Sequence, residues 1–269
     1  MLLDTHAHSD FSMDASYPLE TMLQEALRKG LSVFTITDHF DPDYPNPLGE
    51  GEIFTMDSGP YLQEVLRLKE KYKGQIELLF GVELGLQPHV AEELRAWVQG
   101  LPLDFVIGSS HIVDGRDPYL PGFFDDRSEH DGYRDYFRTF LPNLAVYSDL
   151  SVYGHLDYVV RYGPNKDADY RPQDFFEILE PSLARMIELG IGVELNTAGW
   201  AKGLNMPHPH PDILKRYREL GGEIVTIGSD AHLPERIAYG FDRAKDLLRD
   251  LGFRYFTYFR ERKPVFLPL

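Results

Sequence analysis

The sequence of 269 residues contains no cysteine. Disulfide bonds, thiolate zinc sites and cysteine nucleophiles are therefore excluded, whatever the compartment. It also lacks an apolar run near the ~18 residues that span a bilayer. The first residues, Met1–His6, carry neither a basic segment nor an apolar stretch of signal-peptide length. From these absences we expect a cytoplasmic location and no membrane partner.

Positive charge is scarce as well. Lys and Arg number 27 against 43 Asp and Glu, which gives a formal net charge of −16. This balance argues against nonspecific nucleic-acid binding and against anionic membrane surfaces. It does not exclude an anionic substrate, because bound cations invert the electrostatics of a site locally. The sequence leaves open both a monomer and a homo-oligomer.

The rest of the composition is that of a globular protein, with 43% hydrophobic, 13% aromatic and 26% charged residues. The length fits one large domain, and no repeat or break in composition marks a second. We therefore predict a single domain over residues 1–269.

Short apolar runs alternate with helical patterns along most of the chain. Continuous apolar runs are typical of strands buried on both faces of a parallel sheet. The predicted strands are Leu2–Thr5, Val33–Thr37, Ile76–Val82, Phe105–Gly108, Val152–Gly154, Ile191–Leu195 and Ile224–Gly228. The predicted helices are Leu19–Lys29, Gly59–Tyr72, His89–Gln99, Asp131–Leu141, Pro172–Leu189, Pro211–Leu220 and Arg236–Leu251. Seven such units favour a (β/α) barrel, and the pattern alone leaves an open doubly wound sheet as the alternative.

Two long segments lie outside these elements. Phe40–Ser58 is rich in Pro, Asp and Gly, and Val113–His130 is the second. Long loops in a compact domain are often binding loops or lids. We predict loops here, and the first is a candidate lid.

Polar residues cluster where the predicted strands end. Possible metal ligands follow every strand except the sixth: His6, His8, Asp38, His39, Glu83, His111, His155, Asp230 and His232. In a barrel the carboxyl ends of the strands converge on one face, where active sites lie. Imidazole and carboxylate together suit Zn, Mn, Fe and related divalent ions. The sequence therefore predicts a metal centre on this face.

Other histidines of the chain are predicted to be structural or exposed. His208-Pro209-His210 repeats the spacing of His6 and His8, but it lies between prolines before a predicted helix. We expect it to be structural, with His210 near the start of that helix. His89 and His130 are expected on the surface.

The motifs resemble those of the PHP (polymerase and histidinol phosphatase) superfamily. The matching segments are His6-Ala7-His8, Thr37-Asp38-His39, Gly81-Val82-Glu83, Gly108-Ser109-Ser110-His111, Gly154-His155 and Gly228-Ser229-Asp230-Ala231-His232. Within that superfamily the sequence resembles the monofunctional histidinol-phosphate phosphatases, through its length, Gly154–Tyr162, Glu194–Gly199 and Arg260–Pro264.

This resemblance implies a distorted (β/α)7 barrel with two or three divalent metal ions, Zn, Fe or Mn. The first metal would be held by His6, His8, Glu83 and Asp230, and the second by Glu83, His111 and His155. The third would be held by His39 and His232 together with Asp14. Asp14 is alternatively a proton donor to the leaving alkoxide, and both Asp14 and His39 count as catalytic.

The implied reaction is hydrolysis of L-histidinol phosphate to L-histidinol and phosphate by a metal-activated hydroxide, late in histidine biosynthesis. Arg161 fits the phosphate-clamping arginine of the family. After Asn196-Thr197-Ala198-Gly199 the family usually has Arg-Lys, whereas this chain has Ala201-Lys202. Lys202 or Arg127 would then supply the second basic contact, and Asn196 is a further candidate substrate contact.

Three other functions remain as alternatives. A PHP phosphoesterase acting on nucleotides or other phosphate esters would use the same metals. A non-catalytic PHP module is disfavoured because the chain keeps the ligand set. An amidohydrolase-like barrel, which also begins with His-x-His, usually places a Lys at the metal bridge, and here that role falls to Glu83.

Overall fold

Seven parallel strands form a sheet in which the spatial order follows the chain order. They are β1 (Leu3–Asp4), β2 (Val33–Ile36), β4 (Glu77–Gly85), β5 (Phe105–Ser109), β6 (Val152–Tyr153), β7 (Gly192–Asn196) and β8 (Val225–Gly228). The short β3 (His39–Phe40) continues the path of β2 and also pairs with β4. This computed structural model describes residues 1–46, 49 and 53–269.

The sheet closes on itself beyond β8. The backbone N–H of Asp230 donates to the carbonyl of His6 at 2.8 Å, and that of His8 donates to Ala231 at 2.9 Å. The last strand is therefore bonded to the segment that follows β1. The predicted (β/α)7 barrel is confirmed, and the open doubly wound sheet is wrong.

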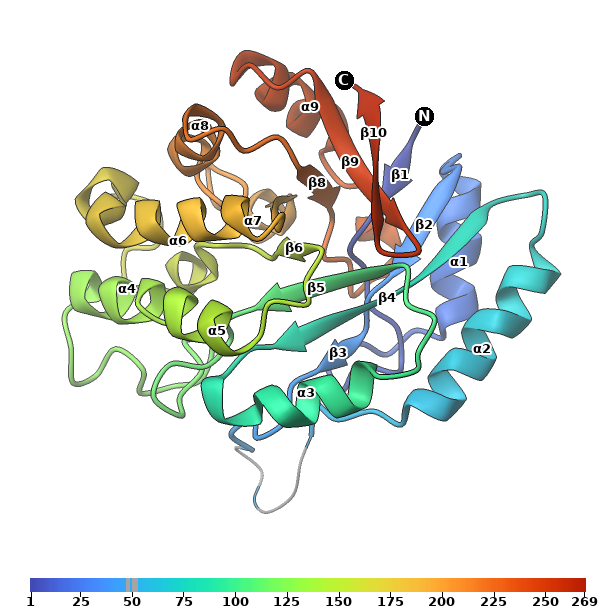
Figure 1. Cartoon of the computed structure of the whole chain (residues 1–269), viewed down its shortest axis with the longest axis horizontal. Helices are drawn as coiled ribbons and strands as arrows, with labels where there is room; N and C mark the ends of the chain where they lie inside the picture. The colour runs from blue at the N-terminus through green and yellow to red at the C-terminus, as the bar shows by residue number, and fades with distance from the viewer. Residues whose placement is uncertain (47–48, 50–52) are drawn as a thin grey trace.

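Helices surround the strands, as Figure 1 shows. The longer ones are α1 (Leu19–Arg28), α2 (Ser58–Lys71), α3 (Ala91–Val98), α4 (Glu129–Phe137), α5 (Phe140–Val146), α6 (Phe176–Glu188), α8 (Pro211–Glu219) and α9 (Phe241–Asp250). Gly30 and Gly190 follow α1 and α6 with φ of 79° and 72°, as expected of glycines after a helix end. A main cluster of buried apolar side chains extends along the chain from Leu3 to Tyr258.

Two helix predictions were wrong in their bounds. The segment predicted as one helix, 131–141, is divided between α4 and α5. Pro142 lacks the N–H that would continue α4, and it lies in the first turn of α5, where that N–H is not needed. The helix predicted from Arg236 begins only at Phe241, because Ala238 and Gly240 have φ of 54° and 71°.

A C-terminal hairpin was not predicted. It consists of β9 (Tyr255–Arg260) and β10 (Lys263–Pro268), joined by Glu261 and Arg262. Phe259 of β9 packs with Phe105, Ile107 and Val152 in a small separate cluster. Phe105 and Ile107 are two residues apart and share one face of β5, opposite the neighbouring Val106. The hairpin thus covers side chains of β5 and β6 that the main core does not.

The predicted loops lie between regular elements. In 40–58, residues 47–48 and 50–52 lie outside the described part, so the lid prediction falls partly on undescribed residues. Segment 113–130 ends where α4 begins at Glu129. In the described part of the chain, no helix is both long enough and apolar enough to cross a membrane.

Candidate metal centre and substrate cavity

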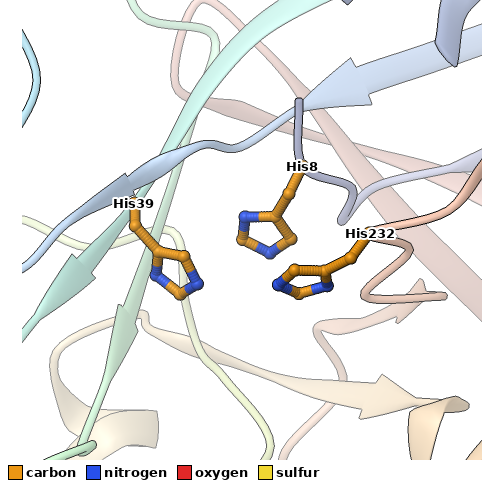
Figure 2. A group of neighbouring side chains, drawn as sticks. All are labelled: His8, His39 and His232. Carbon is orange, nitrogen blue, oxygen red and sulfur yellow. The ribbon is translucent and has the colours of Figure 1, made fainter. Parts of the chain in front are cut away.

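The predicted ligands converge at the carboxyl ends of the strands. They are His6, His8 and Asp14 after β1, His39 in β3, Glu83 in β4, His111 after β5, His155 after β6, and Asp230 and His232 after β8. In Figure 2 the imidazoles of His8, His39 and His232 point toward one another from different segments. The fold therefore brings together side chains more than 220 positions apart in the sequence, such as His8 and His232.

Glu83 lies at the centre of this cluster. Its Oε2 is 3.0 Å from His6 Nε2 and 3.4 Å from His8 Nε2. Its Oε1 is 2.8 Å from His155 Nε2 and 3.3 Å from His111 Nε2. His39 Nδ1 lies 3.4 Å from Oε2 as well. Since each oxygen faces a different set of imidazoles, one carboxylate can bridge two cations.

A second group of ligands lies beside the first. The ring of His8 stacks on those of His39 and His232, with centroids 4.4 and 4.2 Å apart. Asp14 Oδ2 is 2.9 Å from His232 Nε2 and 3.8 Å from His39 Nε2. A nitrogen of each of these three histidines lies within 4.8 Å of the other two, close enough to share an ion.

Two carboxylates outside the predicted ligand set fix the direction of the imidazoles. His6 Nδ1 lies 2.6 Å from Glu194 Oε1, and His111 Nδ1 is bonded to Asp41. In the neutral imidazole, the nitrogen that donates to a carboxylate carries the proton. The Nε2 lone pairs of His6 and His111 then face the oxygens of Glu83, as in the carboxylate–histidine–metal arrangement.

The same orientation recurs on the other side of the cluster. His232 Nδ1 lies 3.0 Å from the carbonyl oxygen of Asp230. His8 Nδ1 is 3.3 Å from the Ser12 hydroxyl, which itself donates to Asp38 at 2.6 Å. The Nε2 lone pairs of four histidines thus face carboxylate oxygens: those of His6, His8 and His111 face Glu83, and that of His232 faces Asp14. Such acceptor pairs are unfavourable unless a cation or a proton lies between them, so the donor set fits divalent metals.

Electrostatics at Glu83, His8 and Asp14 agree with this donor set. Burial raises the pKa of Glu83, but the charges of His6 and His39 outweigh it and hold that pKa well below its usual value. Burial and the nearby His232 and His39 lower the pKa of His8 to about 3, so His8 is neutral, as a ligand must be. For Asp14, burial raises the pKa, and His39 and His232 more than reverse this. An ionised Asp14 suits metal ligation better than proton donation.

A cavity of about 530 Å³ opens above the cluster. The ligands Asp14, His39, Glu83, His111, His155, Asp230 and His232 line it. Arg161 and Lys202 line it as well, together with aromatic side chains from the loops. This cavity is large enough for a small organic phosphate, because ligand sites typically measure ~300–1,000 Å³.

His208 orients Arg161 through a hydrogen bond. Its Nε donates to His208 Nε2 at 3.4 Å, and His208 Nδ1 is 2.5 Å from Asp157 Oδ1. One terminal nitrogen of Arg161 lies 3.5 Å from Asp230 Oδ2 and is buried without a hydrogen-bond partner. A buried donor of this kind is suited to an acceptor brought by a ligand.

Two residues predicted to contact the substrate lie outside the lining of this cavity. Asn196 Nδ2 donates to Glu194 at 3.1 Å and to Asp230 at 3.4 Å, so it supports metal-site carboxylates. Arg127 is 3.1 Å from Asp135 and stacks on Phe123 at 4.8 Å. Among the described lining residues of the cavity, neither Asn196 nor Arg127 appears.

The remaining histidines follow the predictions. His210 is the N-cap of α8, with its ring nitrogen accepting from the N–H of Asp212. His208 is buried and structural, although its contact with Arg161 connects it to the cavity. His89 and His130 are exposed.

Sequence reasoning missed the residues that orient the ligands. Glu194 is a fully buried acid inside a predicted apolar strand, and that position was a usable signal. Asp41 follows His39 by two residues, the spacing that places side chains on the same side of a strand. His208 gave no signal, because only the fold brings it to Arg161.

The family model of the PHP domain matches residues 4–198, well over half of the chain. The chain belongs to the PHP domain family. A histidinol-phosphatase from Lactococcus lactis subsp. lactis (strain IL1403) is 29% identical to this PHP protein. The match covers 97% of this PHP protein and 95% of the relative. A probable histidinol-phosphatase from Clostridium acetobutylicum is 31% identical, over 91% of both chains.

Solved structures give the same result. The crystal structure of histidinol phosphate phosphatase from Lactococcus lactis, complexed with zinc, L-histidinol and phosphate, superposes with a TM-score of 0.88. It is 28% identical in sequence, and the match covers 98% of both chains. The barrel of this PHP protein is therefore shared along its whole length with that phosphatase.

Proposed function

We propose that this chain is a metal-dependent phosphatase that hydrolyses L-histidinol phosphate to L-histidinol and phosphate. One observation carries the proposal: imidazole lone pairs and carboxylates converge at a cavity that also receives a buried guanidinium, one terminal nitrogen of which has no hydrogen-bond partner. The similarity to a phosphatase crystallised with zinc, L-histidinol and phosphate supports the substrate.

The metal ligands are assigned by the contacts around Glu83. The first cation would be held by His6, His8, Glu83 and Asp230, the second by Glu83, His111 and His155, and the third by Asp14, His39 and His232. When bound, such cations supply an activated water and neutralise charge on the phosphoryl oxygens. Glu194 and Asp41 keep the imidazoles of His6 and His111 pointed at the cations.

Arg161 and Lys202 act on the phosphate. The free terminal nitrogen of Arg161 donates to a phosphoryl oxygen, and the planar guanidinium fixes the orientation of the group. Lys202 is exposed at the edge of the cavity and adds a point charge. These contacts hold the phosphorus against the metal ligands, which lowers the entropic part of the barrier.

The net charge of −16 argues against a nucleic-acid partner. It is compatible with a small anionic substrate that is held by a local cationic site. We also infer that the enzyme acts in the cytoplasm as a single barrel domain, either alone or as a homo-oligomer. Size-exclusion chromatography with light scattering distinguishes these two states.

The test is phosphate release from L-histidinol phosphate against a panel of nucleotides, sugar phosphates and phosphotyrosine. Purified protein is loaded separately with Mn, Zn, Fe or Mg. The proposal predicts that kcat/KM for L-histidinol phosphate exceeds that of every other ester in the panel. Metal-dependent hydrolysis that favours a nucleotide would keep the site chemistry and overturn the substrate.

A further inference from the structure

Asp117 is a buried carboxylate in the wall of the cavity. Asp117 is only 2% exposed, and it lines the cavity that also contains the histidine cluster. Its Oδ2 accepts from the Tyr44 hydroxyl at 2.6 Å, and its Oδ1 accepts from the backbone of Tyr119 at 2.7 Å. The Tyr158 hydroxyl adds a bond of 3.2 Å. Hydroxyls from two segments thus hold this carboxylate in one position.

The negative charge of Asp117 has no cationic partner in the described part of the chain. The other four carboxylates of the cavity, Asp14, Asp41, Glu83 and Asp230, each lie against histidines of the metal cluster. Burial raises the pKa of Asp117, and its hydrogen bonds and the nearby His111 only partly reverse this. A buried charge is costly unless it is paired, which indicates a cation supplied from outside the protein.

Tyr158 places this carboxylate relative to the phosphate site. Its ring lies 5.3 Å from that of His111 and 4.9 Å from the Arg161 guanidinium, while its hydroxyl reaches Asp117. The carboxylate therefore lies at the hydroxyl end of a phenol whose ring borders both His111 and the Arg161 guanidinium. A ligand whose phosphate contacts Arg161 can direct a group on its carbon skeleton toward Asp117.

Aromatic rings surround the same part of the cavity. Tyr44 packs on Phe54 with centroids 4.5 Å apart, and Tyr162 packs against Tyr119 at 5.5 Å. All four side chains line the cavity. Ring faces attract cations, and aromatic enclosures are a common means of binding ammonium groups.

We propose that Asp117 and the tyrosines around it bind the ammonium group of the substrate and make the cavity selective for amine-bearing phosphate esters. This inference rests on the proposed function, since L-histidinol phosphate carries a primary amine two carbons from its ester oxygen. Asp117 is thus a specificity-determining residue that contacts the amine of the substrate, while Arg161 contacts its phosphate. The carboxylate accepts from the ammonium group, while the tyrosine hydroxyls keep its remaining lone pairs occupied.

The experiment compares L-histidinol phosphate with its desamino analogue, which keeps the imidazole and the phosphate. Asp117→Asn preserves size and removes the charge. It should lower kcat/KM for L-histidinol phosphate by about 10- to 100-fold, the effect of losing a charged hydrogen bond. Activity on the desamino analogue should change less than about twofold on the same basis. Equal losses on both esters, or no loss on either, would overturn the inference.

Binding gives a second readout that does not depend on turnover. By calorimetry, Asp117→Asn should weaken L-histidinol binding and leave inorganic phosphate binding unchanged. Equal weakening of both would indicate a structural role and overturn the assignment. Tyr44→Phe removes one hydrogen-bond donor to Asp117 and keeps the carboxylate. It should lower kcat/KM less than Asp117→Asn does, and only for the amine-bearing ester. A loss shared by the desamino analogue would contradict the inference.

The proposed function can fail separately from this inference. If the wild-type protein hydrolyses nucleotides, sugar phosphates or phosphotyrosine better than L-histidinol phosphate, both are overturned. If it prefers L-histidinol phosphate to these esters but not to the desamino analogue, only the inference is overturned. If the wild type prefers L-histidinol phosphate to the desamino analogue and Asp117→Asn retains this preference undiminished, only the role of Asp117 is overturned.

Discussion

At the scale of single residues, the environment of Glu83 explains how a buried carboxylate stays ionised. An isolated buried carboxylate would be neutralised, because burial disfavours the charged form. Here imidazoles face both oxygens, at 2.8 to 3.4 Å. Glu83, which has imidazoles at both of its oxygens, is therefore the carboxylate suited to bridge two cations.

Glu83→Gln should lower metal content and reduce kcat by at least about 100-fold, since even outer-sphere changes at metal sites cost ~10–100-fold. The amide is neutral and cannot bridge cations with two equivalent oxygens. Metal analysis and steady-state kinetics measure the two effects. Glu77→Gln is the matched control, because Glu77 lies on the same strand and pairs with Arg260 at the surface. Full metal content in Glu83→Gln would contradict the bridging role.

His208→Ala should raise KM for L-histidinol phosphate and the inhibition constant of inorganic phosphate by about 10-fold, because Arg161 loses the acceptor that orients it. Metal content should not change, since His208 contacts no predicted ligand in the hydrogen bonds of the described residues. His208→Gln keeps an acceptor and should recover part of the phosphate affinity. His89→Ala, at the surface, is the control. A fall in kcat with unchanged KM would exclude positioning of Arg161.

The candidate ligands were predictable from the sequence, whereas the contacts that orient them were not. His6, His8, Glu83 and His155 each follow or end a strand, and strand ends converge in any barrel. Glu194 and His208 depend on contacts between segments far apart in the chain. His6 and Glu194, for example, are 188 positions apart.

At the scale of elements, glycines near the strand ends leave room for the metal cluster. A methyl group on Gly228 of β8 would collide with Glu194 and with the Cβ of His6. A methyl group on Gly85, at the end of β4, would collide with Asp41. The two carboxylates that orient imidazoles therefore each occupy space that a glycine leaves free.

Gly228→Ala should destabilise the protein by about 1–3 kcal/mol through overpacking. It should also weaken metal binding, because Glu194 is displaced from His6. Urea unfolding and a metal competition assay measure these changes. Gly59→Ala, in the first turn of α2, is the control, since its methyl group meets only Asp57 at 3.3 Å. Wild-type metal affinity in Gly228→Ala would contradict the role given to Glu194.

The strands of the barrel were predicted because they are continuously apolar, whereas the C-terminal hairpin was not. Strand β10 alternates exposed and partly buried residues and contains Pro264 and Pro268, which are tolerated only in an edge strand. The pattern of α4 and α5 predicted one helix because their apolar spacing is similar, and only Pro142 marks the division. Local patterns thus identified the barrel better than the elements added to it.

At the scale of the whole molecule, the fold of this acidic protein places carboxylates and imidazoles together in one buried centre. Without metals, the carboxylates need protons on the imidazoles. Burial lowers the pKa of His39, but Glu83 and Asp14 raise it more, from 6.5 to about 9. The pKa values of His6 and His111 are also raised, since nearby carboxylates outweigh burial. The folded metal-free protein therefore binds more protons than the unfolded chain.

This difference predicts the pH dependence of the metal-free protein. The contribution of His39 to the free energy of unfolding should be present in full below its unfolded pKa of 6.5 and be lost as pH rises through its folded pKa, about 9. Urea unfolding across this range, after chelation, measures the trend. Metal-loaded protein should show no such fall, because metals bind the neutral imidazoles. Metal-free stability that rises across the same range would contradict the prediction.

We infer that the histidine–carboxylate cluster hydrolyses L-histidinol phosphate with bound metals. The most direct test measures kcat/KM for this ester on one protein preparation before chelation, after chelation and after metal is restored. Activity should be lost with the metals and return as divalent ions refill the site. Hydrolysis that continues undiminished in protein shown by metal analysis to be metal-free would contradict it.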